Sequence, residues 1–479
     1  MAGTYARSTK ALIIGGGPAG YMAAIRLGQL GIAATVVERR EVGGECLNRG
    51  CIPSKALIHA SRLYAALATE GPTVGVTASG CRFDLAATMR WKDGVVERER
   101  AGVRSLLKAA GAQLLAGEAR FTGPKTAVYT APDGGTERID FEYALIATGA
   151  VPVELPGFET DGERVVNAWQ LLSIPQLPRS IVILGGGVSG CELGQFLARV
   201  GVEVTIVELL PQLLPGVEAD LSRELTRAME KLGVRVRVGT RAERLDRSSH
   251  GVTMTVRGPA GPESIAADLA FITVGKRPAT ANLGLEDAGV EFDRRSGFVR
   301  VDDQQRTNVP HIFAAGDVAR PPMLAHKSYR EGIVAAEAIA GRPARFDHRA
   351  MPSVVFTVPE LASVGLSLDE ATRQGYAARE ARFPYAALGR AHAAHAVDGW
   401  VKIVAETETG RLLGVHAAGE AAGEFLPEAT HAIEVGSTVR DIAETIHAHP
   451  TFSEALGEAA LLWLGEPMHV ARRSADARR

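Results

Sequence analysis

The stretch Ala11-Leu-Ile-Ile-Gly-Gly-Gly-Pro-Ala-Gly20 decides the fold of this chain. It is a short apolar strand that runs into Gly-x-Gly-x-x-Gly, and a helical pattern follows over residues 21–30. A second apolar strand, residues 34–37, ends in Glu38. Strand, glycine loop, helix, strand and acid together form the βαβ fingerprint of dinucleotide binding. The glycines let the backbone approach a pyrophosphate at the helix N-terminus, and Glu38 would bind the ribose hydroxyls. The alternative is a purely structural glycine-rich turn.

The same pattern returns later in the chain. Residues 180–184 are a strand, Gly185-Gly-Gly-Val-Ser-Gly190 is the loop, and residues 191–200 are the helix. The next strand, residues 202–207, ends in Glu208. Two fingerprints predict two bound dinucleotides and electron transfer between them. No arginine follows Glu208 in Leu-Leu-Pro-Gln-Leu-Leu-Pro-Gly to hold a 2′-phosphate, which favours NAD over NADP.

Composition sets the class of protein. The chain has 479 residues, which suggests two to four domains, and 46% hydrophobic with 23% charged residues is typical of a globular protein. A net charge of −2 gives no indication of binding to nucleic acid or to an anionic membrane. Four cysteines argue against a secreted, disulfide-stapled protein. We expect no signal peptide and no membrane span, and therefore a cytoplasmic protein. We also expect the basic tail, residues 471–479, to fray.

Two of the four cysteines lie in Gly43-Gly-Glu-Cys-Leu-Asn-Arg-Gly-Cys-Ile-Pro-Ser-Lys55. On a regular helix, Cys46 and Cys51 would point about 140° apart, so a bridge between them requires a bend. Gly50 and Pro53 can supply one. A disulfide that closes so short a loop adds little stability to the fold. It suits reversible redox chemistry, because the two thiols stay close together after reduction. Two free buried cysteines are the alternative.

This segment resembles the active-site segment of the flavin disulfide reductases, and CLNRGCIPSKAL is most similar to that of the dihydrolipoyl dehydrogenases. The resemblance implies a Cys46–Cys51 redox disulfide and an α/β fold with two Rossmann-like domains, for FAD and for NAD. It implies an FAD-binding part over residues 1–151, an NAD-binding domain over 152–278 and a return to the FAD domain over 279–350. Residues 351–479 would form an α+β dimerisation domain.

A second chemical segment is His447-Ala-His-Pro-Thr-Phe-Ser-Glu454. A histidine that acts as a base needs a carboxylate to fix its tautomer. The segment resembles the catalytic-base segment of the same family, in which the second histidine, His449, is the base and Glu454 orients it. His447 as the base is the alternative. A zinc site is disfavoured because no third ligand is near in the sequence, and we expect no metal.

By resemblance, the protein oxidises protein-bound dihydrolipoamide through Cys46, Cys51 and FAD and reduces NAD⁺. Lys55 and Glu192 match an ion pair that the family holds beside the flavin. Two related classes of enzyme are disfavoured. Glutathione and trypanothione reductases have Pro-Lys-Lys where this chain has Pro53-Ser-Lys55, and mercuric reductase has a vicinal cysteine pair near its C-terminus, whereas the last cysteine here is Cys191. A flavoprotein scaffold without activity would need neither the cysteines nor the histidine.

The resemblance also implies partners and cofactor contacts. The partners would be a second copy of the chain, with shared active sites, and a lipoylated acyltransferase or glycine-cleavage carrier protein. The residues expected to contact the cofactors are Gly15, Gly17, Pro18, Ala19, Gly20, Glu38, Arg39, Gly44, Lys55, Ala119, Thr148, Gly149, Gly185, Gly187, Val188, Gly190, Glu208, Gly275, Asp317, Met323, Leu324, Ala325 and His326.

Overall fold

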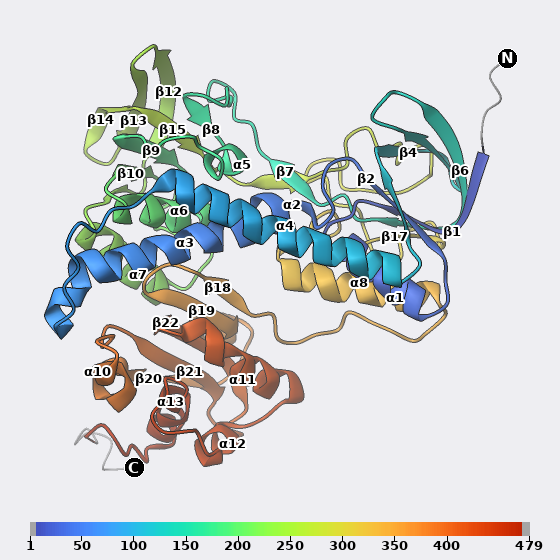
Figure 1. The fold of residues 1–479 in the computed structure, drawn as a ribbon. Coiled ribbons are helices and arrows are strands. Elements are labelled where there is room, and N and C mark those ends of the chain that lie inside the picture. The colour runs from blue at the N-terminus through green and yellow to red at the C-terminus, as the bar shows by residue number, and fades with distance from the viewer. Residues whose placement is uncertain (1–5, 472–479) are drawn as a thin grey trace. The chain divides into compact units, whose positions relative to one another are not determined.

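The protein divides into two compact units, each built from two separate stretches of chain. A computed structural model describes residues 6–471, so most of the tail expected to fray lies outside the described residues. Unit 1 contains the chain up to Leu177 and Phe271–Asp347, and unit 2 contains Pro178–Ala270 and the chain from His348 onward (Figure 1). Residues 152–177 and 271–278, expected in the NAD-binding domain, belong to unit 1. The division into four segments stays a prediction.

Unit 1 is organised around a seven-stranded sheet of order β3-β2-β1-β6-β5-β4, with β17 also paired to β6. The pairs β1–β2, β1–β6, β2–β3 and β6–β17 are parallel, whereas β4, β5 and β6 are antiparallel neighbours. A separate antiparallel pair is formed by β7 and β16. The strands are β1 (Ala6–Ile14), β2 (Ala34–Glu38), β3 (Gln113–Ala116), β4 (Glu118–Gly123), β5 (Thr126–Thr130), β6 (Thr136–Ile146), β7 (Ala150–Pro152), β8 (Val165–Val166), β16 (Lys276–Pro278) and β17 (Ile312–Ala314).

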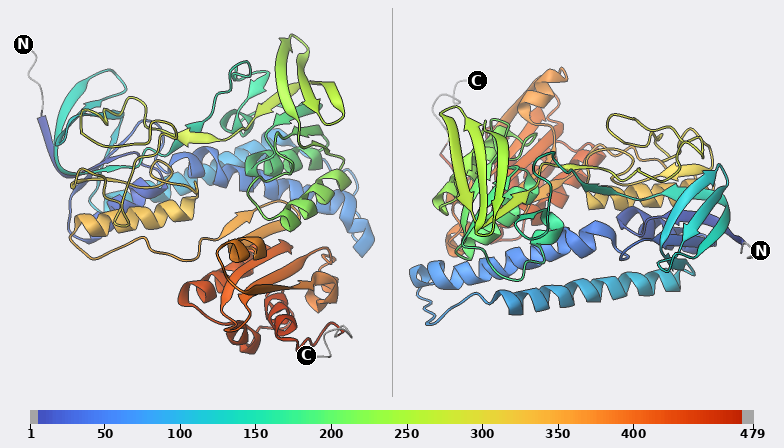
Figure 2. Two further views of the ribbon diagram at one scale, coloured as in Figure 1. Left: turned by 180° about the vertical axis from the view of Figure 1, so that it is seen from behind. Right: turned by 90° about the horizontal axis from the view of Figure 1, so that it is seen from above.

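Helices complete unit 1. They are α1 (Pro18–Gln29), α2 (Gly44–Arg49), α3 (Cys51–Ala65), the short η1 (Ala66–Glu70) and η2 (Gly71–Val74), α4 (Leu85–Ala109), α5 (Ala168–Leu171) and α8 (Ala325–Ile339). Helices α1 and α8 pack closely because Gly332 has no side chain: a Cβ there would lie 2.3 Å from the carbonyl oxygen of Ala19. Helices α3 and α4 run side by side (Figure 2). The fully buried Leu12 and Ile13 of β1 face opposite sides of the sheet and belong to different core clusters.

Unit 2 contains the second fingerprint and the C-terminal region. Strands β11, β10 and β9 are parallel neighbours, and β15 lies next to β9 in the same sheet. Strands β12, β13 and β14 form an antiparallel sheet. A further antiparallel sheet has the order β18-β19-β22-β21-β20. The strands are β9 (Ser180–Leu184), β10 (Glu203–Val207), β11 (Arg235–Arg237), β12 (Arg241–Ser248), β13 (Gly251–Gly258), β14 (Gly261–Ala267), β15 (Leu269–Ile272), β18 (Ser353–Val355), β19 (Glu360–Gly365), β20 (Ala378–Pro384), β21 (Trp400–Glu406) and β22 (Leu412–Gly419).

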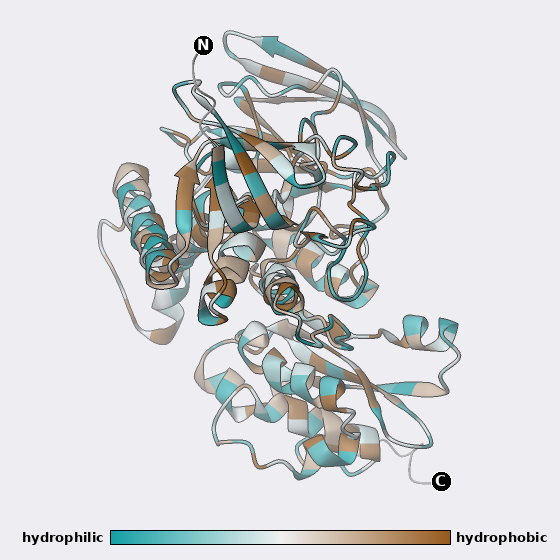
Figure 3. Cartoon of the chain, turned by 90° about the vertical axis from the view of Figure 1, so that its right-hand side faces the viewer, coloured by the Kyte–Doolittle hydropathy of each residue, from teal (hydrophilic) through white to brown (hydrophobic). Residues whose placement is uncertain are grey.

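The helices of unit 2 pack with these sheets. They are α6 (Val188–Arg199), α7 (Ala219–Lys231), α9 (Leu368–Arg373), η3 (Tyr385–Ala387), α10 (Gly389–Ala393), α11 (Ala422–Val435), α12 (Val439–Glu444) and α13 (Glu454–Leu464). Strand β21 is buried at every residue but its last. Figure 3 shows apolar residues on the strands in brown. Within residues 6–471, no helix is both long and apolar enough to cross a membrane. The predicted α/β fold with an α+β C-terminal region is confirmed.

Candidate active site

The redox turn, which we define as residues 44–51, carries a disulfide between Cys46 and Cys51 whose Cα atoms are 4.7 Å apart. Helix α2 ends at Arg49, Gly50 has a non-helical backbone, and α3 begins at Cys51. Gly50 therefore supplies the predicted bend. Pro53 does not: it lies in the first turn of α3, where its missing N–H leaves no helical hydrogen bond unmade. Cys81 and Cys191 are free.

Asn48, between the two cysteines, fixes the redox turn. Its Nδ2 donates to the carbonyl oxygens of Val42 and Gly44 at 3.0 and 2.8 Å, and its Oδ1 accepts from Arg100 at 2.9 Å. Gly44 packs directly on the first glycine loop, because a Cβ there would lie 2.6 Å from the Cα of Gly17. The redox turn is thus held against the fingerprint loop.

A cavity of about 750 Å³ opens between the fingerprint loop and the redox turn. Both cysteines line it, together with these predicted cofactor residues: Gly15, Gly17, Pro18, Ala19, Glu38, Arg39, Gly44, Ala119, Thr148, Gly149, Asp317, Met323 and Ala325. Gly20, Lys55, Leu324 and His326 do not line it. Gly20 instead permits close packing of the loop and helix, since a Cβ there would lie 1.9 Å from the carbonyl oxygen of Gly15.

The polar groups of this cavity fit FAD. The hydroxyl of Thr148 is buried and has no hydrogen-bond partner among the described residues, so it is available to a ligand. Asp317 lines the cavity, where its carboxyl can hydrogen-bond the hydroxyl groups of a ribityl chain, and burial raises its pKa. Glu38 already accepts backbone N–H bonds from Gly16 and Arg40 at 2.7 and 2.8 Å, which fixes its carboxylate at the end of β2.

The second fingerprint repeats this geometry in unit 2. Glu208 is buried, and its carboxylate accepts from the N–H groups of Gly186 and Leu210 at 2.7 and 2.8 Å. Gly187 caps α6, and Val188 begins that helix with an exposed side chain. These residues lie together as expected for a dinucleotide site: Gly185, Gly187, Val188, Gly190 and Glu208.

Gly275, the remaining residue of the predicted NAD site, belongs to unit 1. Its carbonyl oxygen accepts from the N–H of Val153 at 3.0 Å. Its contact with NAD therefore stays a prediction.

Lys55 and Glu192 lie in different units, so their ion pair also stays a prediction. Lys55 is on α3, one turn beyond Cys51. Glu192 is buried on α6, and its Oε1 accepts from the backbone N–H of Phe356 at 2.9 Å.

His449 and Glu454 form the predicted pair in unit 2. The Nδ1 of His449 lies 2.8 Å from Oε1 of Glu454, and the other carboxylate oxygen accepts from the N–H of Thr451 at 2.7 Å. Burial alone would raise the pKa of Glu454, but the Thr451 N–H and the His449 ring together lower it. An ionised carboxylate only accepts, so Nδ1 carries the proton and Nε2 is left as the basic nitrogen. The imidazole side chain is 76% exposed and free to meet a substrate.

His447 has a different environment. Its Nε2 lies 3.0 Å from Oε1 of Glu428, and its side chain is only 10% exposed. The hydrogen bond to Glu428 raises the pKa of His447. Its ring packs on Gly457, where a Cβ would lie 3.0 Å from Nδ1. These contacts are those of a structural histidine, which supports His449 as the base.

Sequence reasoning missed several residues that line the cavity, among them Arg40, Glu45, Arg49, Trp169 and Lys276. Glu45 and Arg49 lie inside the quoted cysteine segment, so their position was a usable signal. Trp169 had no signal, because it lies on the four-residue helix α5, far along the chain from the redox turn, and only the fold brings the two together.

The family to which the chain belongs follows from comparison with known proteins. Residues 9–332 match the pyridine nucleotide-disulphide oxidoreductase family, and residues 351–460 match the dimerisation domain of that family. The chain therefore belongs to the pyridine nucleotide-disulphide oxidoreductases, which confirms the predicted FAD and NAD cofactors. The match to the dimerisation domain supports a homodimer.

Within that family, the chain is a homologue of the dihydrolipoyl dehydrogenases. It is 42% identical to the dihydrolipoyl dehydrogenase of Bacillus subtilis over 473 residues, which cover 98% of this chain and 100% of the relative. It is 43% identical to that of Thermus scotoductus over 466 residues, with 96% and 99% covered. The redox disulfide predicted from the resemblance is present as Cys46–Cys51.

Solved structures share the fold. LpdA from Mycobacterium tuberculosis is similar with a TM-score of 0.88 and 29% identity, over 94% of this chain and 99% of that one. The HOCl-induced flavoprotein disulfide reductase RclA from Escherichia coli is similar with a TM-score of 0.84 and 26% identity, over 95% and 99%.

Proposed function

We propose that the protein oxidises dihydrolipoyl groups to lipoyl groups and reduces NAD⁺ to NADH. The observation that carries the proposal is the Cys46–Cys51 disulfide at the wall of a cavity that fits FAD. The His449–Glu454 pair supplies a base, and the full-length likeness to dihydrolipoyl dehydrogenases supports the substrate.

In the proposed reaction, Nε2 of His449 takes the proton of one substrate thiol. The thiolate attacks Sγ of Cys46, the Cys46–Cys51 bond breaks, and Cys51 leaves as a thiolate. His449 passes this first proton to solvent and takes the proton of the second substrate thiol. The second thiolate attacks the substrate sulfur of the mixed disulfide, which closes the cyclic disulfide product and releases Cys46 as a thiolate. The dithiol pair then holds the two electrons that the substrate has lost.

FAD, when bound, supplies the two-electron chemistry that carries these electrons to NAD⁺. The chain's own part is to hold the cofactors. The loop at residues 15–20, Thr148 and Asp317 would contact FAD, and the loop at residues 185–190 with Glu208 would contact NAD. Lys55 and Glu192 would place their charges beside the flavin.

Two subunits would share each active site. The cysteines belong to unit 1 and the base to unit 2, in the region that matches the dimerisation domain. A two-fold interface repeats each contact twice and so creates two equivalent composite sites. We propose that His449 and Glu454 face Cys46 of the other subunit, and that a lipoylated acyltransferase or glycine-cleavage carrier protein delivers the substrate in the cytoplasm.

The test is NADH formation from dihydrolipoamide and NAD⁺ by the flavin-loaded protein. Activity that disappears in both Cys46→Ser and Cys51→Ser, with flavin content retained, is the expected result. An inactive wild-type protein that carries FAD would reject the function. Lipoylated proteins recovered with the protein from its native cell would identify the complex that it serves.

A further inference from the structure

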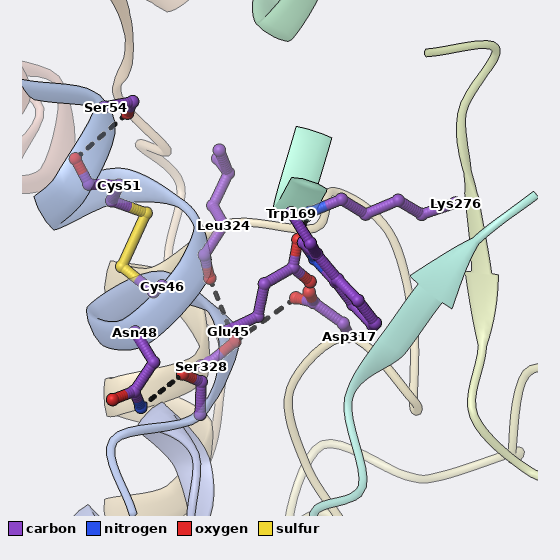
Figure 4. Close-up of a disulfide and its surroundings, with 11 residues drawn as sticks. Glu45, Cys46, Asn48, Cys51, Ser54, Trp169, Lys276, Asp317, Leu324 and Ser328 are labelled. Atoms are coloured by element: carbon purple, nitrogen blue, oxygen red, sulfur yellow. Dashed lines mark hydrogen bonds and ion pairs between the residues drawn. A yellow bond between two sulfur atoms is a disulfide. The ribbon is translucent and has the colours of Figure 1, made fainter. Parts of the chain in front are cut away.

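Glu45, directly before Cys46, joins three separate parts of unit 1. Its Oε1 accepts from Nζ of Lys276 at 2.6 Å and from Nε1 of Trp169 at 2.9 Å. Lys276 begins β16, five residues after the chain returns to unit 1 at Phe271, and Trp169 lies on α5, shortly before the chain leaves that unit. Figure 4 shows Glu45 pointing away from the disulfide, toward both partners.

These contacts are partly buried. The side chains of Glu45 and Lys276 are 19% and 36% exposed, and both line the cavity. The guanidinium groups of Arg40 and Arg49 lie 5.0 and 5.8 Å from the centre of the Trp169 ring, which holds the indole in place. The Glu45 carboxylate therefore binds both the indole N–H of Trp169 and the ammonium of Lys276 at the wall of the cavity.

Both charges act on the chemistry of the cavity. Burial raises the pKa of Asp317, and Lys276 and Glu45 then shift it in opposite directions. Consecutive Cα atoms are about 3.8 Å apart, so the Glu45 carboxylate lies within roughly 11 Å of the Cys46 sulfur by chain geometry alone. A charge at that range, in a partly buried site, alters the stability of a thiolate.

We infer that Glu45 is a positioning residue of the redox centre: it fixes Lys276 beside the redox turn, and the balance of the two charges sets how readily the disulfide is reduced. The inference rests on the proposed redox role of the disulfide. Reduction creates thiolate charge, which Lys276 favours and Glu45 opposes. In the native protein the two effects largely cancel.

The experiment equilibrates the flavin-loaded protein anaerobically with mixtures of reduced and oxidised dithiothreitol at pH 8. Dithiothreitol gives up two electrons and becomes a disulfide, while the Cys46–Cys51 bond becomes a dithiol that is partly ionised to thiolate at this pH. Alkylation and mass measurement then give the reduced fraction. Glu45→Gln should raise the equilibrium constant for reduction by about five- to tenfold, and Lys276→Met should lower it by a similar factor.

The double variant Glu45→Gln/Lys276→Met should return to within about twofold of wild type, and Lys276→Arg should leave the constant unchanged because the charge is kept. Glu137→Gln is the matched control, since it breaks the similarly exposed Arg7–Glu137 pair of the same unit. If the equilibrium constants of both single variants shift in the same direction, or do not shift, this inference is overturned while the proposed function stands. A wild-type disulfide that dithiothreitol cannot reduce would overturn the proposed function as well.

Discussion

Replacing Glu454 with Gln should weaken the catalytic base without removing it. Glu454 uses both oxygens, one for Nδ1 of His449 at 2.8 Å and one for the N–H of Thr451 at 2.7 Å. Glutamine keeps one acceptor oxygen. When that oxygen serves Thr451, the amide N–H₂ faces Nδ1 and favours the tautomer with the proton on Nε2, which cannot accept the substrate proton.

The size of the loss follows from the bond that is removed. A hydrogen bond to a charged group contributes about 1.5–3 kcal/mol, and the exposure of His449 favours the lower end. About 1.5–2 kcal/mol corresponds to a loss of roughly 10- to 30-fold in rate. His449→Gln removes the base altogether and should cost about a hundredfold or more.

The assay is kcat/KM for dihydrolipoamide, with flavin content as the measure of folding. Glu458→Gln is the matched control, because Glu458 lies one turn further along α13 and holds His469 at the same 2.8 Å. It should leave the rate unchanged. A Glu454→Gln variant with wild-type activity, or one as inactive as His449→Gln while still folded, would refute the tautomer argument.

The same variant has a pH signature in stability. The pKa of Glu454 is lowered in the folded protein, so the stabilisation by its charge is present above the ordinary carboxyl pKa of about 4.3 and is lost as the pH falls through the lowered value. The difference in unfolding temperature between wild type and Glu454→Gln should therefore persist at about pH 5 and close below about pH 4. A difference that has already vanished at about pH 6 would contradict this.

Three further predictions concern the cofactors, the thiols and the subunits. NAD should exceed NADP in kcat/KM by at least about tenfold, because the buried Glu208 would repel a 2′-phosphate, and Glu208→Ala should narrow the gap; parity in the wild type would reject this role. Thiol titration of the oxidised, denatured protein should find two thiols, Cys81 and Cys191, whereas four would rule out the disulfide. Mixed subunits of inactive Cys46→Ser and His449→Gln should recover up to about half of the native sites in each heterodimer, and no recovery after proven exchange would mean that each subunit completes its own site.

The sequence predicted those parts of the site that local backbone chemistry requires. A Cβ at Gly15 would lie 2.3 Å from the carbonyl oxygen of Ala147, so the loop depends on glycine and its pattern is readable. The His449–Glu454 pair was readable because both residues lie in one short segment.

What the sequence could not supply depends on contacts between distant segments. Trp169 and Lys276 contact Glu45 only because the segment that leaves unit 1 and the segment that returns to it both pass the redox turn. Pro53 was assigned part of a bend that Gly50 makes alone, because Pro is equally compatible with the first turn of a helix. The three strands β12, β13 and β14 were not predicted. In β12 the many charged residues obscure the alternation of a half-buried strand, whereas the alternation of Val252, Met254 and Val256 in β13 was a usable signal.

The path of electrons through the Cys46–Cys51 disulfide is tested most directly by an anaerobic titration of the flavin-loaded protein with dihydrolipoamide. One equivalent per site should produce two new thiols, located at Cys46 and Cys51 by alkylation and mass spectrometry, and a long-wavelength absorbance band from a thiolate beside the flavin. NAD⁺ added next should yield one NADH per site. A Cys46→Ser/Cys51→Ser variant that forms NADH from dihydrolipoamide at the wild-type rate would contradict the account.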